Sequence, residues 1–203
     1  NRVLEFIERN YYSFLNVSLA ACKATADAAS GIPYSTVVSV LTRNGRETGI
    51  RLSGMGDRWF TTKAPVPAGR FFDGYGKKDA NADMGDSTIT ETVGVGAFAM
   101  AAAPEIVSYL GGSSNEVIRF TQQMYNITFG EHRDFKIGLL GGKGTPLGID
   151  VLKILETGIT PIINTGIAHR EGRIGQIGAG YTHAPAQCFD AAFLGFGSLY
   201  GRV

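Results

Sequence analysis

Two glycine-rich segments of this chain carry side chains that suit the binding of a small anion. Glycine is kept where the backbone turns sharply or approaches another group closely. Guanidinium groups match the geometry of carboxylates and phosphates. In the first segment, the residues expected to contact the anion are Arg51, Gly54, Gly56, Asp57 and Arg58. In the second segment, they are Asn164, Thr165, Gly166, His169, Arg170 and Gln176.

Arg58 and His169 are the residues to which we assign catalytic roles. Arg58 offers a forked donor, and His169 can transfer a proton or polarise a carbonyl at neutral pH. Both segments end predicted strands, and strand ends are where loops collect ligand-contacting groups, so we expect them to meet in one pocket. The alternatives are a structural ion network in which Asp57 pairs with an arginine, and a histidine that only stabilises the fold.

Three other segments resemble known ligand motifs but lack required positions. An EF-hand loop starting at Asp79 needs Gly and Glu where Met84 and Thr90 stand. Residues 94–99 fit a loose dinucleotide pattern without a strand before it, and residues 141–145 fit a phosphate loop only in part. We therefore expect no metal and no cofactor. An oxygen-ligand site of another kind at 79–86 and a simple anion-binding turn at 141–145 stay open.

Composition indicates a globular protein with a large core. Of 203 residues, 44% are hydrophobic and 18% charged, and the net charge of +1 favours neither nucleic acid nor membrane as a partner. The apolar stretch 93–110 contains Pro104 and Glu105, so it predicts a buried helix and not a membrane span. Cys22 and Cys188 stand alone, which favours reduced core thiols and a cytoplasmic location.

Hydrophobic periodicity and turn residues predict an α+β fold with antiparallel hairpins. The Asn44-Gly45 pair predicts one hairpin, and residues 170–173 join another. Helices are predicted over 3–29, 87–110 (with a second helix beginning at Pro104), 113–129, 150–156 and from 185 onward. Strands are predicted over 35–42, 48–52, 135–140, 159–168 and 174–182, and a long loop over 61–86.

We expect residues 1–203 to form one compact domain, with sub-lobes 1–110 and 111–203 as an alternative division. The chain starts at Asn1 inside a helical pattern, so we also expect it to be part of a longer protein.

The sequence resembles the AllG family, also called YlbE-like or YahG-like. One of the blocks that carry the resemblance reads Gly54-Met-Gly-Asp-Arg-Trp-Phe60. The others lie at 43–45, 79–87, 91–104, 148–150, 164–169 and 175–180, so that they cover essentially the whole chain. Members of the family are longer and have an N-terminal part that is absent here.

The resemblance implies a subunit of an oxamate carbamoyltransferase, which splits oxalurate with phosphate into oxamate and carbamoyl phosphate. These substrates are small anions, and the enzyme has partner subunits. The family supplies no agreed catalytic residues, so none is carried over. A non-catalytic interaction subunit is the alternative, with apolar contact surface at 71–75 and 189–200, and a metal-binding module using residues 79–86 is a third.

Overall fold

The Asn44-Gly45 pair forms the predicted hairpin. In the computed structural model, which describes residues 2–10, 12–105 and 113–201, the Asn44 side chain accepts the N–H groups of Arg46 (3.0 Å) and Glu47 (2.8 Å). Gly45 has φ +84°, a conformation that favours glycine. The hairpin belongs to a sheet of order β3-β2-β1-β5, with strands β1 (Val38–Asn44), β2 (Glu47–Leu52), β3 (Phe60–Lys63) and β5 (Met84–Gly85).

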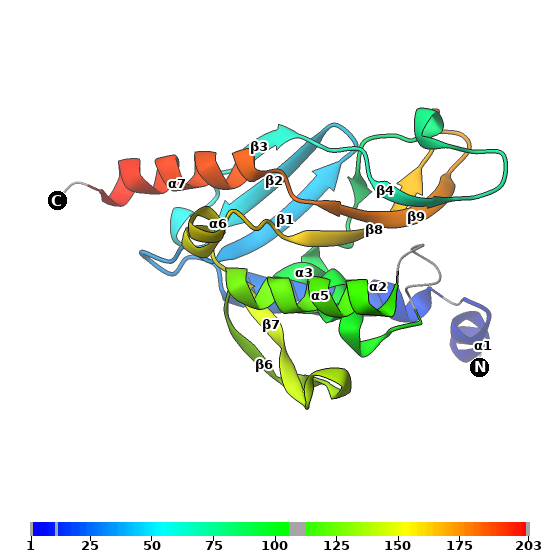
Figure 1. The fold of residues 1–203 in the computed structure, drawn as a ribbon, viewed down its shortest axis with the longest axis horizontal. Helices are drawn as coiled ribbons and strands as arrows, with labels where there is room; N and C mark the ends of the chain where they lie inside the picture. The colour runs from blue at the N-terminus through cyan, green and yellow to red at the C-terminus, as the bar shows by residue number, and fades with distance from the viewer. Residues whose placement is uncertain (1, 11, 106–112, 202–203) are drawn as a thin grey trace.

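The second predicted hairpin is also present. β8 (Ile162–Ala168) and β9 (Gln176–His183) pair antiparallel, with Thr165 opposite Gly180. β4 (Ala68–Phe71) adds to the outer edge of β9, which gives the order β4-β9-β8. Figure 1 shows this sheet beside the first, with α5 (Ser114–Met124) running beneath β8.

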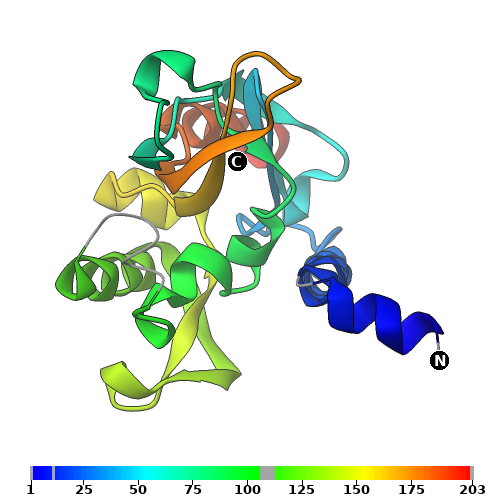
Figure 2. The same cartoon turned by 90° about the vertical axis from the view of Figure 1, so that its right-hand side faces the viewer.

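A two-stranded hairpin projects from the body of the protein. β6 (Thr128–Ile137) and β7 (Lys143–Ile149) pair only with each other, and Figures 1 and 2 show them extending away from the other sheets. The prediction of a buried strand over 135–140 is therefore wrong. Between Thr128 and Ile137 the side chains of β6 are exposed or half-buried, whereas most of β7 is buried or half-buried.

Two of the described helices begin at a side-chain cap. Ser113 and Glu116 form a capping box at the start of α5, and Asp150 caps the next helix by accepting the N–H of Leu152 at 3.0 Å. The further helices are α1 (Arg2–Arg9), α2 (Ser13–Ala28), α3 (Ile89–Thr92), α6 (Val151–Thr157) and α7 (Ala186–Tyr200). The 3-10 turns are η1 (Ser53–Met55), η2 (Lys77–Asp79), η3 (Gly96–Ala102), η4 (Tyr125–Ile127) and η5 (Gly138–Leu140).

Three sequence predictions need correction. The helix predicted over 3–29 is divided near Asn10, whose side chain accepts the N–H of Tyr12 and so competes with helical hydrogen bonding. The loop predicted over 61–86 contains β3, β4 and β5, short strands that form only because neighbouring strands offer hydrogen bonds. The region 87–105 is broken by Gly94 and Gly96, both at positive φ. The helix predicted to begin at Pro104 falls mostly on 106–112, outside the described residues.

The main core lies where the first two sheets, α5, α6, α7 and η3 meet. Phe98, Met124, Ile162 and Phe189 are each fully buried in one cluster, and this cluster draws residues from Val38 to Ala192. The fold is α+β with antiparallel sheets, and residues on both sides of position 110 contribute to the same core.

A buried ion pair joins three separate parts of this structure. Arg43 Nε on β1 lies 3.1 Å from Asp83 Oδ2. Both side chains are buried, with 1% of Arg43 and 0% of Asp83 exposed. The remaining guanidinium nitrogens donate to Gly85 O (3.0 Å), Ser87 Oγ (2.9 Å), and Thr88 and Thr165 Oγ1 (3.3 Å each). Thr165 in turn donates to Asp83 Oδ1 at 2.7 Å. The network therefore holds β1, the 83–88 segment and β8 together.

We predict that Asp83→Asn lowers the free energy of unfolding by about 3–5 kcal/mol, because it leaves the Arg43 charge buried without its counter-ion. Urea unfolding at pH 7 measures the change. Asp57→Asn is the matched control: Asp57 also pairs with an arginine, but its side chain is 98% exposed. Its loss should cost no more than about 1 kcal/mol. Equal effects of the two substitutions would show that the Arg43–Asp83 pair does not stabilise the fold in this way.

Candidate functional site

The first predicted segment turns tightly at the end of β2. Gly54 in η1 donates its N–H to Ser35 O (2.9 Å), and its carbonyl accepts the hydroxyl of Tyr200 (2.7 Å). A Cβ atom at Gly54 would lie 2.7 Å from Ser35 O, which is closer than real Cβ contacts. Gly54 is thus required by packing against the 32–35 turn, and its amide is already used.

Arg51 and Asp57 form an ion pair across the turn that follows. The Arg51 guanidinium also donates to Gly56 O at 2.9 Å, and Gly56 has φ +57°. Arg58, one residue beyond Asp57, is exposed, and among the described residues no side chain pairs with its guanidinium. Of the two arginines in this turn, Arg58 is the one whose fork is available to a ligand.

A surface hollow lies on the sheet beside this turn. Its volume is about 210 Å³, and its described lining comprises Thr42, Asn44, Glu47, Gly49, Trp59 and Thr61. Trp59 is 48% exposed and packs over Gly49, where a Cβ would lie 3.2 Å from the indole ring. Arg51 Cζ lies 5.8 Å from the centre of the Trp59 ring. The hollow therefore adjoins the arginine-bearing turn.

The second predicted segment places His169 at the far end of β8. Its Nδ1 accepts the N–H of Glu171 at 2.9 Å, which leaves Nε2 as the protonated nitrogen of a neutral ring. The ring is half-buried, and the Tyr75 ring lies against it edge-on, with centroids 5.7 Å apart. The neighbouring Arg170 is exposed and binds Asp79 O through its backbone N–H (2.8 Å). His169 and Arg170 thus present donors on the same turn.

The other residues of this segment have mainly structural contacts. Thr165 belongs to the buried ion network, and Gln176 Nε2 donates to Gly178 O (2.9 Å). Gly166 gives room to the Gln176 side chain, which would lie 3.0 Å from a Cβ there. Asn164 Oδ1 is buried and has no hydrogen-bond donor in the part of the chain that the structure describes.

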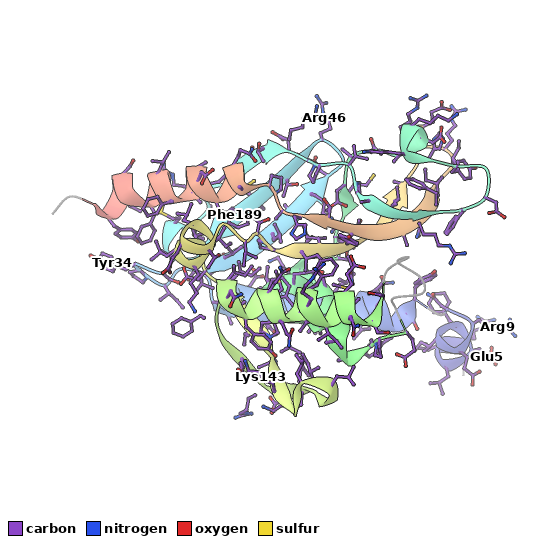
Figure 3. All side chains as sticks on the ribbon, viewed as in Figure 1. Glu5, Arg9, Tyr34, Arg46, Lys143 and Phe189 are labelled. Atoms are coloured by element: carbon purple, nitrogen blue, oxygen red, sulfur yellow. The ribbon has the colours of Figure 1, made fainter. Side chains whose placement is uncertain are left out.

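The structure does not bring the two segments into one pocket. Val38 pairs with Leu52 at one end of β1, whereas Arg43 pairs with Thr48 at the other end and reaches Thr165. Five residues of extended strand span about 16 Å. In Figure 3, Tyr34 lies at the left, and its ring packs at a tilt against Tyr200, which bonds to Gly54; the hairpin turn with Arg46 lies at the top.

Figure 1 shows the β8–β9 turn that follows His169 at the right of the molecule, far from Tyr34. The sequence prediction that the two segments share one pocket is therefore wrong. Anion binding at the Arg58 turn and anion binding at the His169 turn are from here on two separate predictions.

Sequence reasoning missed a third polar site, centred on Glu91. This carboxyl is 1% exposed and accepts the N–H of Ala97 at 2.9 Å, while Thr90 Oγ1 lies 3.0 Å from its second oxygen. Gly96, at φ +60°, leaves space for the carboxyl, since a Cβ there would lie 2.6 Å from Glu91 Oε1. Burial raises the pKa of Glu91 to about 7, against the smaller opposing effects of the Ala97 hydrogen bond and the Arg43 charge.

The contacts of Thr90 fit a protonated Glu91. Thr90 Oγ1 also lies 2.7 Å from Ser87 O. A hydroxyl has one hydrogen, so it can donate to only one of these two oxygens. If Glu91 carries a proton, it can donate to Thr90 while Thr90 donates to Ser87. The glycines at 94 and 96 are the sequence signal that could have indicated this site, because each stands next to a buried polar group, Thr145 and Glu91 respectively.

We predict that the stability of the protein falls as the pH rises from about 4.5 to about 7, because the folded state keeps the Glu91 proton that the unfolded chain releases. The full contribution is present below pH 4.5, is lost above pH 7, and amounts to roughly 3 kcal/mol. Glu91→Gln should remove this part of the pH dependence, measured by urea unfolding at pH 5 and pH 8. The exposed control Glu8→Gln should leave it intact. An unchanged pH profile in Glu91→Gln would contradict the assignment.

Within the described residues, no group of three or more His, Cys, Asp or Glu side chains is arranged to hold a metal ion, and no helix is long and apolar enough to cross a membrane. Asp83, in the segment that resembled a calcium loop, is bound to Arg43. Both cysteines are buried and unpaired.

Comparison with known proteins identifies the family. Residues 1–87 match the model described as oxamate carbamoyltransferase subunit AllG. The chain is 48% identical over 199 residues to the uncharacterized protein YahG of Escherichia coli K12, a match that covers 98% of this chain and 42% of that protein. It is 45% identical over 191 residues to oxamate carbamoyltransferase subunit AllG of the same organism, with 94% of this chain and 46% of that protein covered.

A solved structure has the same fold. The crystal structure of a conserved protein of unknown function from Enterococcus faecalis V583 is 46% identical and superposes with a TM-score of 0.93. The match covers 97% of this chain and 47% of that one. This chain spans about half the length of each relative that it matches. It belongs to the AllG family.

Proposed function

We propose that this chain is part of a subunit of an oxamate carbamoyltransferase-like enzyme and that it binds a small anionic substrate. The observation that carries the proposal is the 45% identity to oxamate carbamoyltransferase subunit AllG over 94% of the chain. The reaction expected from this resemblance exchanges phosphate, oxamate, oxalurate and carbamoyl phosphate, all of them anions. The proposal includes partner subunits. It also includes a cytoplasmic location, because both cysteines are buried and unpaired, as thiols are in a reducing compartment.

The Arg58 turn is the part of the structure that best suits an anion. Its guanidinium is exposed, and Arg51 beside it is held by Asp57 and Gly56. A forked donor can bind two oxygens of a carboxylate or phosphate at once. During carbamoyl transfer negative charge grows on oxygen, and a fixed cation stabilises that charge without a protein nucleophile. Arg58 is thus proposed to bind the substrate and to stabilise the charge.

The His169 turn is the competing location. A neutral imidazole with a protonated Nε2 can donate to a carbonyl, and Arg170 lies next to it in the chain. Asn164 and Gln176 come from the same two strands, β8 and β9. Since the two turns lie at opposite ends of β1, one small anion can contact only one of them.

A non-catalytic role as an interaction subunit is the second candidate, and one observation favours it. The projecting β6–β7 hairpin and its connecting turn expose Phe129 (78%), Phe135 (52%) and Leu139 (58%). Apolar side chains exposed together on a projecting element mark a contact surface. The surface proposed from sequence at 189–200 is only partly available, because Phe189 is fully buried while Leu194 is 69% exposed.

We predict that Arg58→Ala weakens the binding of oxamate or carbamoyl phosphate by about 1.5–3 kcal/mol, the usual contribution of a hydrogen bond to a charged group. This corresponds to a rise in Kd of about 10- to 150-fold, measured by calorimetric titration. Arg58→Lys should recover only part of the affinity, since an ammonium is a point charge.

His169→Asn is the matched test of the competing turn. It should leave Kd unchanged if the anion binds at Arg58. The opposite result, a loss in His169→Asn and none in Arg58→Ala, would move the site to the His169 turn. If neither substitution changes Kd, or if the wild-type chain binds neither anion, the substrate-binding role of this chain is refuted and the interaction role is favoured.

A further inference from the structure

The first helix separates its apolar and charged residues completely. Leu4, Phe6 and Ile7 fall on one side of α1, and its four charged residues fall on the other at the usual 100° per residue. Yet α1 buries none of its residues: Leu4 is 60% exposed, Phe6 65% and Ile7 48%. Figure 2 shows α1 projecting from the rest of the protein.

Apolar side chains are also exposed at the start of α2. The inner side of α2 packs Leu19, Cys22 and Ala26 against α3 and forms a small core of its own. The first turns of α2 are different, because Phe14 is 79% exposed, Leu15 43% and Val17 67%. We call six of these exposed apolar residues the α1–α2 face; they are Leu4, Phe6, Ile7, Phe14, Leu15 and Val17.

This face needs a partner for physical reasons. A helix of eight residues is too short to be stable in water without tertiary packing, since isolated helices below about 12–15 residues are marginal. Large apolar side chains grouped on one exposed surface, unlike scattered ones, mark an interface. The amphipathic pattern of α1 would be explained if its apolar side were covered.

We propose that the α1–α2 face docks against the other half of a family-length chain, the portion that lies outside these 203 residues. The relatives support this occupant. The Enterococcus faecalis structure keeps this fold at a TM-score of 0.93 within a chain of about twice the length, and both Escherichia coli relatives are similarly long. A tethered neighbour has an effective concentration in the millimolar range, so it occupies the face ahead of a second copy at ordinary concentrations.

The proposal is independent of the carbamoyl-transfer proposal, because it concerns packing and not substrate. Hydrogen exchange with mass spectrometry compares residues 2–17 in the isolated 203-residue chain and in the family-length protein that contains it. In the isolated chain these amides should exchange almost as fast as in an unfolded peptide. In the family-length protein they should exchange at least roughly tenfold more slowly. Equal exchange in the two proteins, or a native protein whose mass corresponds to these 203 residues alone, would overturn the proposal.

A pair of substitutions makes the test specific. Phe6→Glu should leave the melting temperature of the isolated chain unchanged, because Phe6 is exposed there, and should abolish the protection of α1 in the family-length protein. Phe129→Glu, on β6, is the control with similar exposure, and it should preserve that protection. If light scattering shows that the isolated chain is a dimer that Phe6→Glu dissociates, a second copy is the occupant and the proposal is wrong.

Discussion

The Arg43–Asp83 ion pair is the interaction on which the middle of this protein depends. A buried charge is costly unless it is paired and its remaining hydrogen-bonding groups are satisfied. Arg43 meets both conditions only when β1, the 83–88 segment and β8 are all in place, because its donors reach Gly85, Ser87, Thr88 and Thr165. The two main sheets share no strand, so this polar network, together with the apolar core, fixes one against the other.

Local structure was predictable from the sequence where its cause is local. The Asn44-Gly45 turn, the capping box at Ser113 and the pair of Asp150 and Gly158 around α6 each form through contacts within a few residues. Their signals are therefore present in a short stretch of sequence. The resemblance to the AllG family could also be recognised from the sequence, because it depends on residue identities and not on their arrangement in space.

Features that depend on distant partners were not predictable. β3 and β4 are four residues each and form because β2 and β9 offer open edges. The strand predicted over 135–140 was expected to be buried, but β6, which overlaps it, pairs only with β7 and is mostly exposed. The candidate site failed for the same kind of reason. The first polar segment follows β2 and the second begins within β8, but β2 and β8 end at opposite ends of β1, and nothing in either segment encodes that direction.

This separation constrains any chemistry that the chain performs. The distance along β1, about 16 Å, exceeds the length of a small anion such as oxamate, so Arg58 and His169 cannot act on the same molecule in this arrangement. A reaction centre built at the Arg58 turn has Arg51 held by Asp57, and a proton donor or acceptor must come from another source. The Trp59 hollow adjoins that turn, because Arg51 lies over the Trp59 ring. Under the proposed function, a subunit of a multi-subunit enzyme would not need to supply every catalytic group itself.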